Sequence, residues 1–216
     1  PFARNKGLKI LKKVKSDFVC FFDDDCEISN NWLNEMIKTQ KKYDADIVTG
    51  PQISKSKNIL LKALERKNKH LSEVKWAATN NVFAKVKIIL DAKLWFTQKL
   101  KNIGGSDQLF FLKLYNQGCK IIWNSNSKVF EQKNIERENF TWFVKRNVRY
   151  GTSSIIIFQE LYGKYSGIYF CILKFIYELL LSVLFLTIFF LSPRLNFFKS
   201  LQYFLRSLST FLGIFG

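Results

Sequence analysis

The sequence lacks the clustered histidines and cysteines that hold zinc in proteins. It contains one histidine, His70, and four cysteines without a CxxC pair or other metal spacing, namely Cys20, Cys26, Cys119 and Cys171. This scarcity excludes the usual zinc-binding motifs. Cys20 and Cys119 lie inside apolar runs, so we predict buried thiols in a reducing compartment. His70 stands among Lys and Asn residues and is predicted to be solvated, without a functional role.

Acidic residues are also scarce. The 17 Asp and Glu residues face 34 Lys and Arg residues, which gives a net charge of +17. Such a surface favours a polyanionic partner: nucleic acid, anionic lipid headgroups or phosphorylated substrates. A drift of the coding sequence toward lysine would explain the lysines equally well. No helix-turn-helix, zinc spacing or other nucleic-acid recognition motif is present, so nucleic-acid binding is the least favoured alternative.

Internal repeats and low-complexity linkers are absent as well. At 216 residues the chain is long enough for one ordinary domain and an appendage. It begins with Pro1 rather than Met, and we expect a chain that is truncated at its N-terminus.

Apolar periodicity and breaker residues predict alternating helices and strands. We expect a buried strand over residues 18–22 and a helix from a cap at Asn30 or Asn31 to Tyr43. The other expected helices are 4–14, 57–72 and 106–117, and the other expected strands are 46–50, 80–86 and 120–124. This alternation predicts an α/β sandwich layered on a mixed sheet.

The main change in composition is the apolar segment IYFCILKFIYELLLSVLFLTIFFL, residues 168–191. As a helix it would be about 36 Å long, enough to cross a hydrocarbon core of about 30 Å. Its only charges, Lys174 and Glu178, are four residues apart and can pair on one helix face. A core helix of a globular domain is the alternative, but the segment favours a membrane helix. The tail that follows is amphipathic and can lie on the surface, re-enter or begin a second span.

Three adjacent carboxylates, Asp23, Asp24 and Asp25, follow the apolar run FVCFF. Ligands of open α/β sheets bind beyond the carboxyl ends of strands, where these residues are expected. On an extended chain Asp23 and Asp25 point to one side and Asp24 to the other. Two hard oxygen ligands suit Mg²⁺ or Mn²⁺, which completes its shell with water and substrate phosphates. An acidic turn that caps the following helix is the alternative explanation.

A basic pair, Arg146 and Arg149, lies three residues apart, so on a helix both share a face with Trp142 one turn earlier. Guanidinium groups bind phosphate oxygens bidentately, and the aromatic ring can pack on a sugar or an acyl boundary. A basic face that lies on anionic headgroups explains the pair equally well.

Four ordered blocks of the sequence match motifs of one known family. ARNKGLKILKKVKSDFVCFFDDDC, residues 3–26, has a helix that opens with Arg-Asn and Gly before a strand ending in a DXD motif. A strand ending in Gly50-Pro51 precedes ATNNVFAKVKII, residues 78–89, which is similar to a T-x-N strand and basic helix. Residues 94–124 contain GGSD, and residues 129–153 contain an E-R and R-x-x-R-x-G pattern. Together these blocks, which cover nearly all of residues 2–154, closely resemble family 2 glycosyltransferases, including membrane-attached members.

The resemblance implies a GT-A-type nucleotide-diphospho-sugar-binding domain, an α/β/α sandwich with a mixed sheet that is incomplete at its N-terminus. Residues 1–154 would be the catalytic domain, and residues 155–216 a membrane-associated helical region. The family's DXD carboxylates, here Asp23 and Asp25, would hold Mg²⁺ or Mn²⁺ against the donor diphosphate. Asp107 of the GGSD block would be the general base of an inverting transfer. The residues implied to bind substrate are Arg4, Asn5, Asp23, Asp24, Asn80, Asn81, Gly105, Arg146 and Arg149.

Asp107, Asn80 and Asn81 each have a simpler alternative explanation. Asp107 would also suit the first turn of a helix, where the helix dipole favours a carboxylate. Asn80 and Asn81 would also suit the end of a loop. The chain departs from the family at Ser106, where a Glu is frequent, which removes one carboxylate from the acceptor side of the site. The family's first strands, with most of the base-recognition pocket, are missing, so this chain alone is expected to bind donor poorly.

The resemblance therefore implies a metal-dependent, inverting glycosyltransferase of cell-envelope polysaccharide or glycolipid synthesis. It would move a sugar from a nucleotide-diphospho-sugar to a lipid-linked or glycan acceptor. The chain is expected to be attached to a membrane, with the catalytic domain on the cytoplasmic side, because its basic charge precedes the apolar segment. A non-catalytic, membrane-tethered partner subunit that binds nucleotide sugar is the first alternative.

Overall fold

The chain forms two compact units. The structure is a computed structural model that describes residues 1–132 and 135–215. Lys133 and Asn134, which belong to the last of the four sequence blocks, lie outside the described residues. The α/β unit comprises Pro1–Lys55, Arg66–Gln98 and Ser106–Gln132, and the helical unit comprises Ser56–Glu65, Lys99–Gly105 and Lys133–Gly216. This division does not coincide with the boundary at residue 154 that we predicted between a catalytic domain and a membrane-associated region. That functional boundary stays a prediction.

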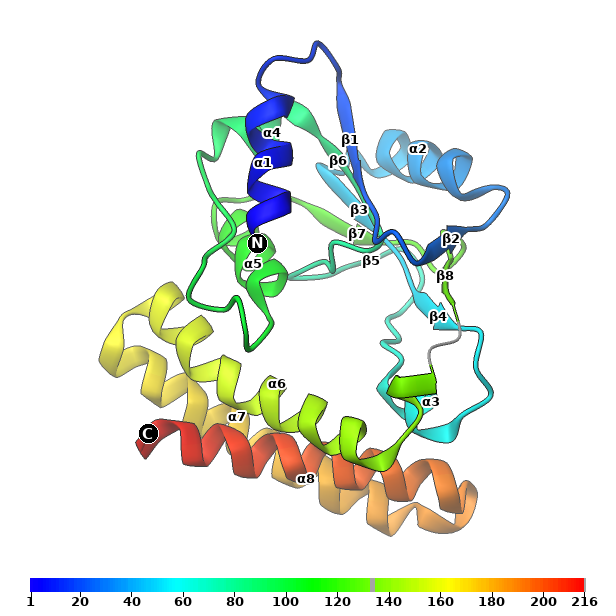
Figure 1. Ribbon diagram of the computed structural model, residues 1–216, viewed down its shortest axis with the longest axis vertical. Coiled ribbons are helices and arrows are strands. Elements are labelled where there is room, and N and C mark those ends of the chain that lie inside the picture. The colour runs from blue at the N-terminus through cyan, green and yellow to red at the C-terminus, as the bar shows by residue number, and fades with distance from the viewer. Residues whose placement is uncertain (133–134, 216) are drawn as a thin grey trace. The chain divides into compact units, whose positions relative to one another are not determined.

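A five-stranded mixed sheet forms the centre of the α/β unit (Figure 1). Its central strand, β3, runs antiparallel to β6 and parallel to β7. The outer strands β1 and β5 run antiparallel to their neighbours β6 and β7. In spatial order the strands are β1 (Phe18–Phe21), β6 (Val82–Lys85), β3 (Ile47–Thr49), β7 (Ile121–Trp123) and β5 (Ser72–Glu73). The mixed sheet expected from the sequence is confirmed.

Helices cover both faces of this sheet. Because side chains alternate along a strand, Ile47 and Val48 of β3 belong to two different cores. The Ile47 core contains residues of α1 (Phe2–Leu11), α4 (Val86–Asp91) and α5 (Ser106–Asn116). The Val48 core contains Trp32 and Met36 of α2 (Trp32–Tyr43). The unit is therefore an α/β/α sandwich, as predicted.

A second, three-stranded sheet was not predicted. Its strands, in spatial order, are β2 (Cys26–Ile28), β8 (Val129–Glu131) and β4 (Gln52–Ser54). Each has three residues, too few to show an alternating pattern in the sequence. The sheet brings the segment after the three aspartates beside segments that lie far away in the chain.

Residues 18–21 form a strand as predicted, but the prediction that this strand is buried is wrong. β1 is at the edge of the sheet, and its residues alternate between exposed and half-buried. Phe18 is 38% exposed and stacks on Phe83 of β6, with ring centroids 4.6 Å apart. Cys20, predicted to be buried, is an exposed residue, whereas Cys119 is buried as predicted. An apolar run alone does not distinguish an edge strand from a central one.

The expected helix over residues 57–72 is much shorter. α3 (Ile59–Leu64) begins at an Asn58 cap, whose side chain accepts a hydrogen bond from the Leu60 amide at 2.9 Å. It ends because Glu65 turns to an extended backbone. The next residue, Arg66, belongs to the α/β unit, where its guanidinium stacks 3.9 Å from the Trp76 ring centroid. Tertiary packing overrides the leucine periodicity here.

The remaining predicted elements of the α/β unit are found close to their expected bounds. α2 and α5 agree with the sequence, and α1 begins and ends a few residues earlier than expected. β6, β3 and β7 lie inside the predicted strands. α2 ends at Asp44, a left-handed residue with φ of 44°. His70 is exposed and accepts a hydrogen bond from the Ser125 amide at 3.2 Å, consistent with a minor polar contact.

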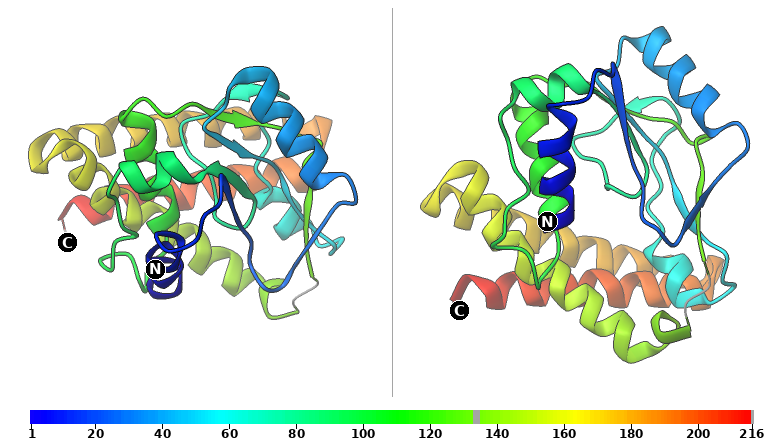
Figure 2. Two further views of the ribbon diagram at one scale, coloured as in Figure 1. Left: turned by 90° about the horizontal axis from the view of Figure 1, so that it is seen from above. Right: turned by 45° about the horizontal axis from the view of Figure 1, so that its top comes forward.

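The helical unit contains α3 and three long helices that lie side by side (Figures 1 and 2). These are α6 (Phe140–Tyr162), α7 (Lys164–Thr187) and α8 (Pro193–Phe215). The predicted apolar segment 168–191 falls on α7 and on the short 3-10 helix η2 (Phe189–Leu191) that follows it. Among the described residues, α7 is the helix that is long and apolar enough to cross a membrane.

Candidate active site

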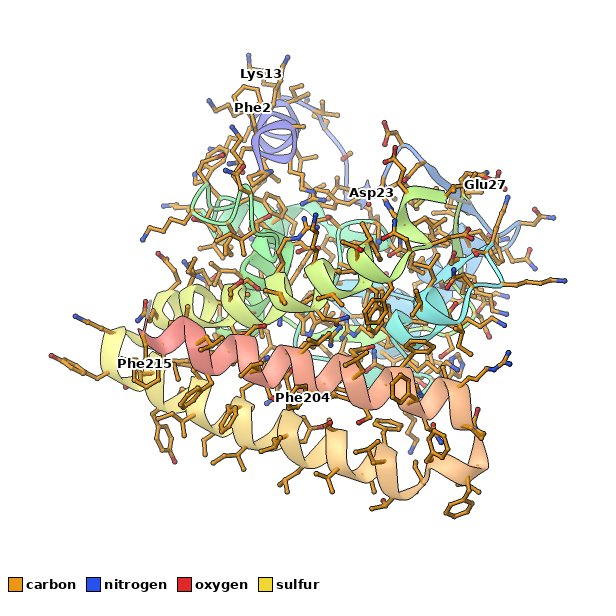
Figure 3. All side chains as sticks on the ribbon, turned by 60° about the horizontal axis from the view of Figure 1, so that its bottom comes forward. Phe2, Lys13, Asp23, Glu27, Phe204 and Phe215 are labelled. Carbon is orange, nitrogen blue, oxygen red and sulfur yellow. The ribbon has the colours of Figure 1, made fainter. Side chains whose placement is uncertain are left out.

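The three aspartates form a turn between the two sheets of the α/β unit. They follow β1 and precede β2, and two backbone hydrogen bonds fix the turn. The Cys26 amide donates to the Asp23 carbonyl oxygen, and the Gln132 amide donates to the Asp25 carbonyl oxygen, both at 3.2 Å. Figure 3 labels Asp23 at the start of this turn and Glu27 just beyond it. The carboxylates therefore follow the end of a strand, as expected from the sequence, but Asp24 and Asp25 lie in a turn and not on the extended chain that the predicted alternation assumed.

Helix α1 places a cation beside the first aspartate. The Arg4 guanidinium lies 3.7 Å from an Asp23 carboxylate oxygen and packs 5.7 Å from the Phe96 ring centroid. The neighbouring Asn5 side chain accepts from the Phe96 amide and donates to the Phe96 carbonyl oxygen, each at 2.9 Å. Asn5 thus ties α1 to the segment around Phe96 and holds Arg4 in position.

The acidic residues share one electrostatic neighbourhood. Burial raises the pKa of Asp23, the Arg4 guanidinium opposes that rise, and Asp25, Asp107 and Asp24 add to it. Asp107, more than eighty residues away in the chain, is therefore close enough to act on Asp23. The structure brings together Arg4 and the four predicted carboxylates.

Asp107 lies in the first turn of α5. Its carboxylate accepts a hydrogen bond from the adjacent Gln108 amide at 2.9 Å. Gly104 and Gly105 lead into the helix with φ of +91° and +89°, a conformation that side chains with a Cβ rarely adopt. The position that the family gives to Glu is taken by Ser106, which is 5% exposed. The loop thus needs its glycines to present Asp107.

The acidic turn fits a divalent cation that is shared with a phosphorylated substrate. No group of three or more metal-ligating side chains occurs in the part of the chain that the structure describes. Mg²⁺ is commonly bound by one or two carboxylates, with the remaining ligands from water and phosphates. Asp23 and Asp25 can supply such a pair. Burial first, and then the charges of neighbouring carboxylates, raise the pKa of Asp23, and a bound cation would favour its ionised form.

Asn80 and Asn81 have different environments. Asn81 is 1% exposed; its amide oxygen accepts from Trp32 Nε1 at 2.8 Å, and its nitrogen donates to the Pro51 and Ser127 carbonyl oxygens at 3.1 and 2.8 Å. All these contacts are internal and join α2 to two loops. Asn80 is half-buried and donates to the Gln52 side chain. Asn80 is thus the better placed of the two to reach a ligand.

Arg146 and Arg149 belong to α6 of the helical unit and are not equivalent. The Arg146 guanidinium lies between the rings of Trp142 and Tyr150, 5.1 and 5.4 Å from their centroids. Its Nε atom is buried and has no hydrogen-bond partner among the described residues. Arg149 is exposed, and its Nε donates to the Lys145 carbonyl oxygen at 3.4 Å. The predicted face shared by Arg146 and Trp142 is present.

The α/β unit also has a polar groove that the sequence did not reveal. Its volume is about 880 Å³, and it begins at Glu27, two residues beyond Asp25. The lining is rich in amides, with carboxylates, lysines and one aromatic ring: Glu27, Ile28, Ser29, Asn30, Asn31, Glu35, Lys55, Asn126, Lys128 and Phe130. The amide-rich stretches SNN, residues 29–31, and NSNS, residues 124–127, were the available signal.

Comparison with known families gives one sequence match. Residues 3–103 match the model of the family described as glycosyl transferase family 2. The matched segment includes Arg4 and the three aspartates and stops before Asp107. None of the curated protein sequences matches the chain.

Solved structures give weaker similarities. One is S. aureus TarS 1-349 in complex with UDP-GlcNAc, with 16% identity and a TM-score of 0.48 over 72% of this chain. Another is GalNAc-T7 with UDP, GalNAc and Mn²⁺, with 14% identity and a TM-score of 0.47 over 71% of this chain. The chain spans 46% and 36% of these two proteins.

Proposed function

We propose that the chain, whose residues 3–103 match the glycosyl transferase family 2 model, takes part in sugar transfer from a nucleotide-diphospho-sugar. Two observations at the same place in the chain support the proposal. The family match spans the three-aspartate turn, and the α/β unit gathers Arg4, Asp23 and Asp107 at that turn.

We assign the residues separate roles. Asp23 and Asp25 hold Mg²⁺ or Mn²⁺, and Asp24 positions the ribose or sugar of the donor. When bound, the cation supplies positive charge against the donor diphosphate. Arg4 orients Asp23 and favours its ionised form. Asn80 and the backbone at Gly105 contribute to the substrate side of the site.

Asp107 is the proposed general base. It accepts the proton of the acceptor hydroxyl as that oxygen attacks the anomeric carbon, and the nucleoside diphosphate leaves from the opposite side of the sugar. Attack from the face opposite the leaving group inverts the configuration at that carbon. One Asp107 oxygen accepts a hydrogen bond from the Gln108 amide, and within the described part of the chain its second oxygen is available for this contact.

The proposed acceptor is a lipid-linked or glycan hydroxyl. The polar groove that begins at Glu27 offers amide, carboxylate and aromatic groups of the kind that bind saccharides. Arg146 and Arg149 would bind phosphate groups of a lipid-linked acceptor or of a membrane. We place the α/β unit on the cytoplasmic side of a membrane, in the synthesis of cell-envelope polysaccharide or glycolipid.

Substitution of Asp107 tests the proposal. A panel of nucleotide sugars is incubated with the full-length protein that contains this chain and with Mn²⁺ or Mg²⁺, and release of nucleoside diphosphate is measured. Asp107→Asn is expected to lower turnover by about 10²–10⁴-fold, the usual contribution of a general base. Asp91→Asn is the matched control, because Asp91 is exposed and pairs with Lys87 of the same helix, α4.

Unchanged turnover in Asp107→Asn would exclude Asp107 as the base. Metal-dependent binding of a nucleotide sugar without any turnover by the chain would instead favour the non-catalytic partner subunit. Calorimetric titration of UDP-sugars and other nucleotide sugars, with and without Mn²⁺, distinguishes these outcomes.

A further inference from the structure

Helix α7 has its small and polar residues inside and its large apolar residues outside. Its buried residues are Gly167, Cys171, Glu178 and Ser182. The side chains that it exposes are almost all apolar or aromatic: Tyr165, Tyr169, Ile172, Leu173, Ile176, Tyr177, Leu179, Leu180, Val183, Leu184 and Leu186. This arrangement is the reverse of a helix that packs onto a core in water.

Helix α8 repeats the same inversion. Its buried residues are all polar: Asn196, Ser200, Gln202, Ser207, Ser209 and Thr210. Its exposed apolar residues form one stripe along the helix: Phe197, Phe204, Leu208, Phe211, Leu212 and Phe215. Figure 3 labels Phe204 and Phe215 on α8, with the side chains of α7 directed outward beside them. An exposed apolar surface of this extent requires a partner that excludes water.

The contacts between these helices include close approaches of small residues and interior polar pairs, as between helices surrounded by lipid, while Leu195, Phe198, Leu201 and Leu205 of α8 pack against an apolar cluster of α3 and α6. Small residues let the backbones approach closely: a Cβ on Gly151 of α6 would lie 2.4 Å from the Ser209 Cβ of α8. Polar groups pair in the interior, including Ser182 with Ser200 at 3.0 Å. Lipid is therefore the occupant that fits the outer faces of α7 and α8.

The register of the helices determines how they can meet a bilayer. Asn196 bonds to the Ile188 carbonyl oxygen at 2.7 Å, and Thr210 contacts Lys174 at 3.3 Å, so α8 returns antiparallel along α7. Helix α6 packs along the same α8. Phe143 contacts the Phe198 ring near one end of α8. The bond from Arg206 to Asn147, at 2.8 Å, lies further along.

This register places the charged part of α6 level with the middle of α7. Asn147 contacts Arg206, one turn before Thr210, and Thr210 contacts Lys174 near the centre of α7. Lys145 and Arg149, beside Asn147 on α6, are exposed. If α7 crossed a bilayer, both cations would lie at the depth of its apolar centre, where exposed charges are strongly disfavoured.

We propose that the helical unit lies in the plane of an anionic membrane surface and that α7 does not cross it. The outer faces of α7 and α8 enter the acyl region, and the exposed cations of α6 remain at the level of the anionic headgroups, where their charge is favoured. A layer of helices then acts as one amphipathic element. This inference concerns the helical unit alone and stands whether or not the chain transfers sugar.

A label-counting experiment distinguishes the two arrangements. Ser166→Cys and Thr187→Cys, both at exposed positions at opposite ends of α7, are combined in a chain whose four cysteines are replaced by Ala. The chain is reconstituted into sealed vesicles of equal parts phosphatidylcholine and phosphatidylglycerol and treated with a membrane-impermeant polyethylene glycol maleimide. An in-plane α7 gives molecules with two labels or none, according to their orientation. Molecules with one label, converted to two after permeabilisation, would overturn the proposal.

A second measurement needs no substitution. Polarised infrared spectroscopy of the unaltered chain in oriented bilayers of the same lipids reports the mean angle of its helices to the membrane normal. Because α6, α7 and α8 contain most of the helical residues, an in-plane layer gives amide dichroism close to that of a helix parallel to the surface. Dichroism of helices parallel to the normal, or failure of the chain to associate with these vesicles, contradicts the proposal.

Discussion

Asp23 stands between opposing electrostatic influences. Partial burial and three neighbouring carboxylates disfavour its ionised form, and the Arg4 guanidinium at 3.7 Å favours it. One cation among four carboxylates leaves net negative charge at the turn, and a diphosphate would add more. A substrate of this kind can therefore bind only with further positive charge, which is the physical argument for a divalent cation at Asp23 and Asp25.

Away from the aspartate turn, Lys85 makes ion pairs that stabilise the fold. Its ammonium contacts Asp44 at 2.8 Å and Asp46 at 3.1 Å. Asp46 also accepts from the Lys120 amide at 3.0 Å. Lys85 thereby joins the end of α2 to strands β3 and β6.

We expect Lys85→Met to lower the midpoint of urea unfolding at neutral pH, because two carboxylates lose their partner. Lys87→Met is the control. It breaks an exposed pair with Asp91 and is expected to change the midpoint little.

The pH dependence of the Lys85→Met effect follows from Asp44. The hydrogen bond and the charge of Lys85 lower the pKa of Asp44 below its ordinary value of 3.8. A lowered carboxyl pKa gives stability that is present above the unfolded pKa and is lost as the pH falls through the folded pKa. The difference between wild type and Lys85→Met should therefore be constant near neutral pH and shrink below about pH 4. A difference that grows in acid would contradict this assignment.

Residues differ in how far their roles follow from the sequence. The aspartate turn could be predicted because the carboxylates are adjacent and follow an apolar strand. Asn81 could not be separated from Asn80, because its partners Trp32, Pro51 and Ser127 lie 30 to 49 residues away. The proximity of Asp107 to Asp23 likewise depends on how α5 and β1 pack, and entered the prediction only through the family resemblance.

At the scale of elements, periodicity predicted which segments are regular but not how far they extend. The central strands β3, β6 and β7 were found because their residues are buried on both faces. The three-residue strands of the second sheet are too short to show a pattern. The ends of α3 depend on the Asn58 cap and on the stacking of Arg66 on Trp76, and leucine spacing records neither.

Two helical glycines are expected to respond oppositely to the same substitution. A Cβ added to Gly7 in α1 meets nothing within 4 Å, whereas one added to Gly151 in α6 would lie 2.4 Å from Ser209 and 2.6 Å from the Arg206 carbonyl oxygen. Gly7→Ala should stabilise by about 0.5–1 kcal/mol through helix propensity. Gly151→Ala should destabilise by about 1–3 kcal/mol because α6 and α8 must separate.

Thermal denaturation in mild detergent, followed by circular dichroism, compares these two variants with the wild-type chain. Each variant is the control for the other, because both replace a helical glycine with the same residue. Equal stabilisation by the two substitutions would show that α6 and α8 do not approach as closely as the structure has them.

At the scale of the whole molecule, the two units follow different rules of burial. The α/β unit buries large apolar side chains around a sheet, as proteins in water do. Helices α7 and α8 bury polar groups and expose apolar ones. The sequence predicted a membrane helix from hydropathy, but hydropathy does not record which face of a helix is buried. The net charge of +17 adds attraction to an anionic surface.

Two interactions, charge attraction and apolar insertion, should therefore hold the chain at a membrane. Salt should weaken the first and leave the second unchanged. Screening shortens the reach of charges to about 3 Å at 1 M salt, but it does not weaken apolar insertion. We expect the wild-type chain to float with anionic vesicles in low and high salt, and Ile176→Asn combined with Leu180→Asn on the outer face of α7 to float only in low salt. Ile10→Asn combined with Val14→Asn, at exposed apolar positions of the α/β unit, is the matched control and should float in both. Complete release of the wild-type chain by salt would mean that charge alone holds it, and the inverted faces of α7 and α8 would then need another partner.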